Sequence, residues 1–298
     1  MRIIRYADGG DRTARLAAVT DEERAFPLQA PDFLTLVREA DREGITPLEA
    51  VQRQIAGAPP LPGDWRRLNL LVPVEAPEVW AAGVTYERSK DARNEESKGD
   101  GGGEETVYDK VYRAKRPEIF FKSTSARTVG PGQPVCLRSD SSWQVPEPEL
   151  GLVLDRGGRI LGYTVGNDMS CRDIEGENPL YLPQAKIWRR SCAIGPAIRL
   201  AETVPDPYRL QIVCRIFRDG RLAVEETAGT GQLRRKLDEL VAFLVRDNEV
   251  FDGTVLLTGT CIVPPGRFTL QPGDRIEIDI SGIGTLVNPV AASANACH

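Results

Sequence analysis

The chain has 298 residues, with 38 Lys plus Arg against 43 Asp plus Glu, and therefore a formal net charge of −5. Its single histidine is the last residue, His298, which excludes a Ser-His-Asp triad and a histidine-ligated zinc site inside the fold. The acidic balance argues against nucleic acid as a partner, and no apolar run approaches the roughly 20 residues of a membrane-spanning helix. Acid-base chemistry must then use Asp, Glu, Lys, Tyr or Cys, and oxygen atoms would hold any metal ion.

The first 70 residues predict a small α/β domain. Residues 2–6 are typical of a short strand, and the apolar spacing over 31–40 predicts a helix. Thr46-Pro47-Leu48-Glu49 is a capping-box pattern with proline at the first helical position, which predicts a second helix. The proline-rich stretch 58–64 is the expected boundary. We therefore divide the chain into residues 1–70 and 71–298.

After about residue 70 the apolar pattern follows the period of β-strands. Residues 150–154 with 160–165, and 210–217 with 222–224, predict two hairpins. Residues 275–280 predict a further strand, and residues 232–248 predict one long helix. Strands outnumber helices and do not alternate with them, so the expected fold class is α+β with a mostly β core.

The glycine-rich segment Asp100-Gly-Gly-Gly103 with Glu104-Glu105 is the most flexible-looking part of the sequence. It matches neither a Walker A pattern nor a GxGxxG fingerprint, so it gives no support to a phosphate cradle. A disordered loop and a mobile lid over a site are the two alternatives.

The six cysteines lie far apart and form no C-x-x-C pair, which favours free thiols over a disulfide framework or a zinc ribbon. The first residues contain no apolar segment of a secretory signal. Both observations predict a cytoplasmic protein.

Two carboxylates stand out before a strongly apolar strand. Glu147 and Glu149 are two residues apart, so on a strand their side chains point to the same face. A divalent cation would compensate their mutual repulsion. The alternative is a solvated edge strand with two surface glutamates, and Pro148 favours that alternative because it cannot donate to a ladder.

Three further segments carry candidate residues. Asp168 follows an apolar strand and is either a third ligand or a turn cap, whereas Arg172 and Asp173 could form a simple local ion pair. Lys186 lies among Pro, Leu and Trp, where a partly buried ammonium would neutralise a bound anion. Thr258-Gly259-Thr260 offers a carboxylate cradle or is simply a strand end.

In this order the segments resemble the fumarylacetoacetate hydrolase superfamily over residues 75–298. The resemblance is carried by Glu147-x-Glu149, Gly162-Tyr163-x₄-Asp168-x-Ser170-x-Arg172-Asp173, Lys186, Gly195-Pro196 and Thr258-Gly259-Thr260. It implies a β-sandwich roll behind a small N-terminal domain and subunits that form homodimers or homotetramers. It also implies a small-molecule 2-keto acid as substrate.

The resemblance assigns roles to particular residues. Glu147, Glu149 and Asp168 match the family's metal ligands for Mg²⁺, with Mn²⁺ or Ca²⁺ as substitutes, Lys186 matches the lysine beside the metal, and Thr260 matches the threonine that binds the substrate carboxylate. Within the family, segments around Tyr86, Glu118 and Glu177 look closest to members that dehydrate 2-keto-3-deoxy sugar acids. Further substrate contacts are expected from Tyr86, Arg88, Lys122 and Gln184.

One departure from the hydrolytic members points to the loss of water. Those members commonly carry a histidine base in the segment that here spans residues 86–92, and this segment has none. The bases and acids of a dehydration can be carboxyl groups. The candidates are Glu118, Glu175 and Lys186, with the assignment of base and acid left open. The alternatives are a family hydrolase or decarboxylase acting on an acylpyruvate or oxaloacetate, and a catalytically silent scaffold.

Overall fold

The computed structural model describes residues 1–7, 13–96, 106–264, 266 and 268–293. Its larger β-sheet is formed by β1 (Arg2–Ala7), β2 (Ala14–Val19), β3 (Ala25–Leu28), β4 (Asn69–Leu70), β5 (Glu78–Gly83), β6 (Glu118–Thr124), β7 (Thr128–Val129), β10 (Pro148–Leu154), β11 (Ile160–Asp168), β13 (Cys192–Leu200) and β16 (Thr254–Thr260). The smaller sheet is formed by β8 (Val135–Cys136), β14 (Gln211–Arg218), β15 (Arg221–Gly229), β17 (Arg275–Ile280) and β18 (Gly284–Ala291), and β9 (Gln144–Val145) pairs with β12 (Ser170–Cys171).

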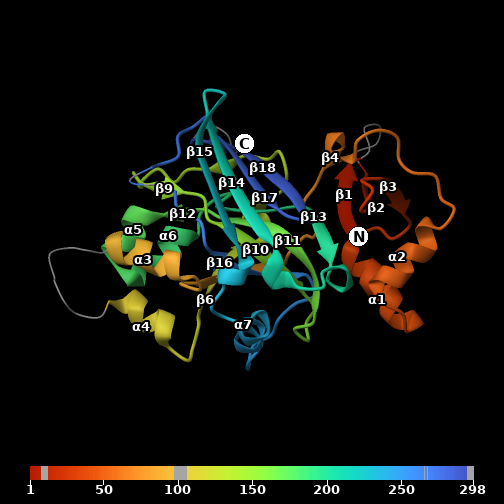
Figure 1. Cartoon of the computed structure of the whole chain (residues 1–298), viewed down its shortest axis with the longest axis horizontal. Helices are drawn as coiled ribbons and strands as arrows, with labels where there is room; N and C mark the ends of the chain where they lie inside the picture. The colour runs from red at the N-terminus through yellow and green to blue at the C-terminus, as the bar shows by residue number, and fades with distance from the viewer. Residues whose placement is uncertain (8–12, 97–105, 265, 267, 294–298) are drawn as a thin grey trace.

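The α-helices are short and lie around the sheets (Figure 1). They are α1 (Phe33–Glu43), α2 (Pro47–Ile55), α3 (Glu87–Glu96), α4 (Val107–Arg113), α5 (Arg172–Glu177), α6 (Leu182–Lys186) and α7 (Leu237–Leu244). The main path of the larger sheet runs β3-β2-β1-β13-β11-β10-β16-β5-β6, and the smaller sheet runs β15-β14-β17-β18-β8. This architecture confirms the expected α+β class with a mostly β core.

The N-terminal strands extend the larger sheet. β1 pairs antiparallel with β13, so that Arg2 lies opposite Arg199. The helix α2 begins with the predicted capping box, in which the Thr46 side chain and the Glu49 side chain each accept a backbone N–H. The division of the chain at residue 70 stays a prediction.

The main core lies between the two sheets, and it fixes the strands that carry the candidate residues. All seven residues of β10 are buried, whereas β14 and β17 alternate between buried and more exposed positions. Leu152 and Val165 belong to the same buried cluster as Ile216 and Ile278. The ends of the β10–β11 hairpin are therefore held by a packed interior.

Two sequence predictions need correction. β10 is a central strand, because it pairs with β11 on one side and β16 on the other. Pro148 is tolerated because it is the first residue of the strand. The helix predicted over 232–248 is shorter, since α7 begins at Leu237, whose N–H donates to the Tyr208 hydroxyl at 2.9 Å. The segment 100–105 and His298 lie outside the described residues.

The structure also bears on the membrane and cysteine predictions. None of the described helices combines the length and apolar character needed to cross a membrane. The described cysteines are free and buried: Cys136, Cys171, Cys192, Cys214 and Cys261.

Candidate active site

The candidate metal ligands converge because the hairpin β10–β11 places them at one end. Pro148 pairs with Asn167, so Glu147 and Asp168 lie next to each other across the two strands, and the Asp168 N–H donates to the Glu147 carbonyl at 3.0 Å. One carboxylate oxygen from each of Glu147, Glu149 and Asp168 lies within 4.8 Å of the others. All three residues are at most 3% exposed, which rules out the alternative of two solvated surface glutamates.

Basic side chains neutralise part of this carboxylate cluster. Lys186 Nζ lies 2.8 Å from Glu147 Oε2, 3.2 Å from Asp168 Oδ2 and 2.7 Å from the Ser170 hydroxyl. Arg172 lies 3.0 Å from Glu147 Oε1, on the opposite oxygen. Arg172 therefore pairs with a carboxylate of the cluster. Among the described residues, the local ion pair with Asp173, which the sequence allowed, does not form.

Glu149 receives less compensation than its neighbours. Its Oε2 accepts the Gly259 N–H at 2.6 Å, and no ion pair to Glu149 occurs among the described residues. Burial, followed by repulsion from Asp168 and Glu147, raises the pKa of the Glu149 carboxyl well above its ordinary value. Three buried hard oxygen donors with one poorly compensated charge fit a divalent cation such as Mg²⁺.

A small cavity borders the carboxylate cluster, and the other candidate catalytic groups line it. Its walls include the side chains of Glu118 from β6, Glu175 from α5 and Lys186 from the end of α6, with Thr260 at the end of β16. The space holds about 10 Å³ in this conformation, close to the room needed by one water molecule. A sugar acid therefore requires the walls to move apart.

The structure places the predicted substrate-binding residues unequally. Thr260 lines the cavity, whereas Tyr86 is 1% exposed and belongs to the hydrophobic core beside it. The Arg88 guanidinium pairs with Glu226 at 2.7 Å, and the exposed Gln184 offers its backbone carbonyl to Arg138.

Lys122 lies behind the carboxylate cluster and is fully buried. Its Nζ lies 2.6 Å from Asp168 Oδ1, and it donates to the carbonyls of Met169 and Lys186. These contacts turn its ammonium away from the cavity and toward Asp168. Lys122 is thus positioned to orient Asp168 and Lys186. The sequence instead predicts that Lys122 contacts the substrate.

No role was predicted for Ser89 or Ser170, although Ser170 is part of the motif that carries the family resemblance. Ser89 lines the cavity from α3 and is 3% exposed. Ser170 binds Lys186, as described above. The spacing of Asp168, Ser170 and Arg172 was an available signal, because residues two apart on an extended chain face the same side.

The turn that leads from β5 to α3 is tightly constrained. Val84 has a φ of 52°, a left-handed conformation that a β-branched residue adopts only under strong constraint. The Thr85 hydroxyl donates to the Thr258 carbonyl at 2.7 Å, which ties this turn to the end of β16. Gly259 allows the close approach, because a Cβ there would lie 2.0 Å from Thr85 Oγ1 and 2.9 Å from the Ala82 carbonyl.

Replacing this glycine should therefore destabilise the protein strongly. Gly259→Ala combines a clash with a φ of 95°, and we expect the free energy of unfolding to fall by about 3 kcal/mol. Gly273→Ala is the matched control, since its φ is 94° and nothing lies within 4 Å of its added Cβ, so it should cost about 1 kcal/mol. Urea unfolding measures both variants, and equal losses would contradict this explanation.

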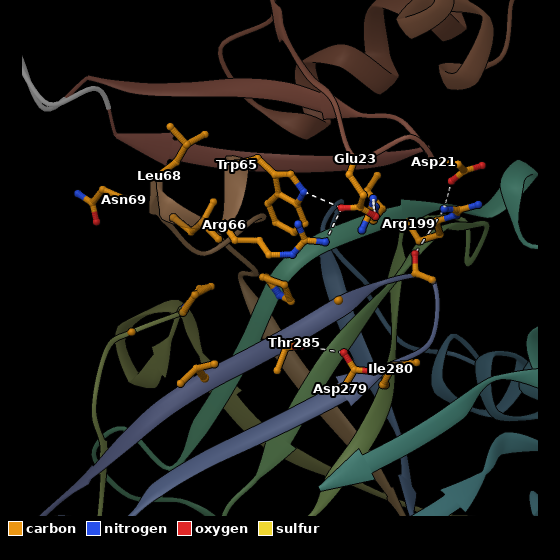
Figure 2. Close-up of a pocket in the computed structure, with 18 residues that line it drawn as sticks. Asp21, Glu23, Trp65, Arg66, Leu68, Asn69, Arg199, Asp279, Ile280 and Thr285 are labelled. Carbon is orange, nitrogen blue, oxygen red and sulfur yellow. Dashed lines mark hydrogen bonds and ion pairs between the residues drawn. The ribbon is translucent and has the colours of Figure 1, made fainter. Parts of the chain in front are cut away.

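A larger cavity of about 700 Å³ lies elsewhere, between the N-terminal strands and the β17–β18 hairpin (Figure 2). Its arginines already have partners, since Arg2 lies 2.6 Å from Glu23 and Arg199 lies 2.6 Å from Asp21. The Trp65 indole also donates to Glu23 at 2.9 Å. The cavity contains none of the carboxylate cluster, so its size alone gives no reason to place the chemistry there.

The fold and the buried carboxylate cluster define a class of metal-binding enzyme, and comparisons with known proteins agree. The family pattern described as "Fumarylacetoacetate (FAA) hydrolase C-terminal" matches residues 78–291. The chain belongs to this family.

Particular relatives are also similar. The chain is 48% identical over 223 residues to the 2-dehydro-3-deoxy-D-arabinonate dehydratase of Saccharolobus solfataricus, covering 75% of this chain and 74% of the relative. It is 53% identical over 219 residues to the probable 2-keto-3-deoxyxylonate dehydratase of Haloferax volcanii, covering 74% of each chain. A solved structure of 2-keto-3-deoxy-D-arabinonate dehydratase complexed with magnesium and 2,5-dioxopentanoate has a TM-score of 0.82 and 38% identity, covering 98% of this chain and 99% of that one.

Proposed function

We propose that this protein is a magnesium-dependent hydro-lyase of oxidative pentose degradation. It converts 2-keto-3-deoxy-D-arabinonate, which is the same compound as 2-keto-3-deoxy-D-xylonate, to 2,5-dioxopentanoate. The observation that carries this proposal is the buried cluster of Glu147, Glu149 and Asp168 beside Lys186, in a chain closely similar to relatives named for this activity.

In this proposal the cluster and Thr260 bind the 2-keto acid end of the substrate. Glu147, Glu149 and Asp168 hold the cation. Thr260, at the end of β16, binds the substrate carboxylate by turning its hydroxyl proton away from the Ile262 carbonyl. A bound Mg²⁺ supplies Lewis-acid polarisation of the 2-keto group, which acidifies the protons at C3. Lys186 donates to two carboxylates and a hydroxyl, so in this proposal it provides a positive charge beside the cluster rather than a base.

The remaining carboxyl groups of the cavity transfer the protons. Glu118 and Glu175 are placed there by β6 and α5, and one removes a proton from C3 while the other protonates the departing C4 hydroxyl. Water leaves, and a C3–C4 double bond forms. Transfer of a proton from C5 to C3 then gives an enol with a C4–C5 double bond, and transfer of the enol hydroxyl proton to C4 gives the C5 aldehyde of 2,5-dioxopentanoate. Tyr86, Arg88 and Gln184 stay predicted substrate contacts, whereas we assign Lys122 to the orientation of Asp168.

The substrate class is tested by comparing 2-keto acids in one assay. With Mg²⁺ present, 2-keto-3-deoxy-D-pentonate should yield a semialdehyde that a coupled NAD-linked dehydrogenase detects. Acylpyruvates and oxaloacetate should give much slower release of pyruvate. Turnover of an acylpyruvate or oxaloacetate without turnover of the pentonate would instead support a hydrolase or decarboxylase.

We also propose that the enzyme is a cytoplasmic homodimer or homotetramer. The location is supported by the free, buried cysteines within the described part of the chain. The oligomeric state is an expectation from the family, and a monomer mass in sedimentation velocity would contradict it.

A further inference from the structure

The cavity has one neutral hydroxyl that the proposed chemistry does not use. Ser89 lies in the first turn of α3, and its side chain lines the cavity although the residue is only 3% exposed. Among the described residues, no hydrogen bond joins its hydroxyl to another group. The other neutral hydroxyl of the cavity, that of Thr260, exchanges hydrogen bonds with the backbone of Ile262. Ser89 therefore retains its full capacity to donate and accept.

The surroundings of Ser89 make this hydroxyl distinctive. Apart from the charged groups, the cavity walls are formed largely by apolar side chains and a glycine, namely Ala82, Gly83, Val84, Phe120 and Leu182. A ligand that fills the cavity displaces water from the Ser89 hydroxyl, and a hydroxyl then left without a partner costs about 1–3 kcal/mol, so a ligand that supplies a partner is favoured. A single hydroxyl in an otherwise apolar wall therefore favours ligands that carry a hydroxyl group opposite Ser89 over ligands that lack one.

The backbone before Ser89 holds it in place. The strained Val84 and the bond from Thr85 to the Thr258 carbonyl fix the turn that precedes α3. Thr258 lies two residues before Thr260, at the end of the strand that borders the carboxylate cluster. Ser89 is thus tied through the backbone to the part of the site that binds the keto acid.

We infer that Ser89 binds the C5 hydroxyl of the substrate and makes the enzyme selective for a 2-keto-3-deoxy acid with a terminal hydroxymethyl group. This inference rests on the proposed function. The C5 hydroxyl is chosen over the C4 hydroxyl for a chemical reason. The C4 hydroxyl leaves and needs a proton from an acid, a role for the carboxyl groups of Glu118 and Glu175, whereas the oxygen at C5 stays in the product.

The test pairs one substitution with two substrates. Wild-type protein and Ser89→Ala are assayed with 2-keto-3-deoxy-D-pentonate and with its 5-deoxy analogue, 4-hydroxy-2-oxopentanoate, by the chromatographic loss of each substrate. We expect Ser89→Ala to lower kcat/KM for the pentonate about tenfold or more, and for the analogue less than about twofold. Ser125→Ala, at an exposed position away from the cavity, should change neither value.

The two substrates separate a specific contact from a general defect. An equal loss with both substrates means that Ser89 only supports the fold, and an unchanged kcat/KM for the pentonate means that it makes no contact; either result overturns the inference. If the wild-type protein turns over neither compound, the proposed function fails, and this inference fails with it.

Discussion

Glu149→Gln should abolish dehydration and at the same time stabilise the protein without metal. The substitution removes the carboxylate that has the least compensation in the cluster, while the amide oxygen can still accept the Gly259 N–H. Relief of the repulsion from Glu147 and Asp168 should raise the free energy of unfolding by about 1 kcal/mol. For a chain of this size that corresponds to a rise in Tm of roughly 2–4 °C. Loss of one ligand should lower kcat about 10³-fold.

Thermal unfolding with and without Mg²⁺ gives the second readout for this variant. Saturating Mg²⁺ should raise the Tm of the wild-type protein and leave that of Glu149→Gln unchanged, because only the wild type binds the ion in its folded state. Glu249→Gln, an exposed glutamate away from the cluster, is the control and should behave as the wild type. A Glu149→Gln protein that remains active, or that Mg²⁺ stabilises normally, would contradict the ligand assignment.

Lys186→Met should be both unstable and inactive. The side chain is 2% exposed and its ammonium compensates Glu147 and Asp168, so its loss leaves buried negative charge with too few partners. We expect the free energy of unfolding to fall by about 3–5 kcal/mol and kcat to fall about 10³-fold. The control, Lys115→Met, removes an exposed lysine and should change neither quantity by much.

Addition of Mg²⁺ distinguishes the two roles of Lys186. A divalent cation in the cluster replaces part of the missing positive charge, so it should restore some of the lost Tm of Lys186→Met. It should not restore turnover, because the ammonium is then still absent from the cavity. Recovery of both stability and activity would show that Lys186 serves only the fold.

The convergence of the carboxylates follows largely from local sequence. The apolar runs on either side of Gly157-Gly158 predict a hairpin, and continuing its pairing outward brings Glu147 beside Asp168. The two-residue period then puts Glu149 on the same face as Glu147. Short-range rules were sufficient here because the turn fixes the register of both strands.

Turn and periodicity rules could not predict contacts between strands that lie far apart along the chain. β16, which brings Thr260 opposite Glu149, lies more than 90 residues from β10 along the chain, and nothing local specifies that pairing. The burial of Lys122 depends on the same long-range packing. A lysine beside a run of aromatic residues looks accessible in sequence, yet β6 turns it toward Asp168.

The helix α3 was missed for a different reason. Residues 87–96 are almost entirely polar, so they lack the apolar period from which helices are predicted. The neighbouring helix α4 helps to hold it, because the Asn94 amide donates to Asp109 and the Thr106 hydroxyl donates to Asn94. Apolar periodicity therefore could not identify Ser89, although the family resemblance already marks residues 86–92 as the segment in which hydrolytic members carry a catalytic histidine.

The most direct measurement of the central claim is the rate of 2,5-dioxopentanoate formation from 2-keto-3-deoxy-D-pentonate before and after removal of divalent metal. Protein dialysed against EDTA and then freed of chelator should have little activity, and added Mg²⁺ should restore the full rate. Undiminished formation of the semialdehyde by the metal-free protein would contradict a dehydration that depends on a cation held by Glu147, Glu149 and Asp168.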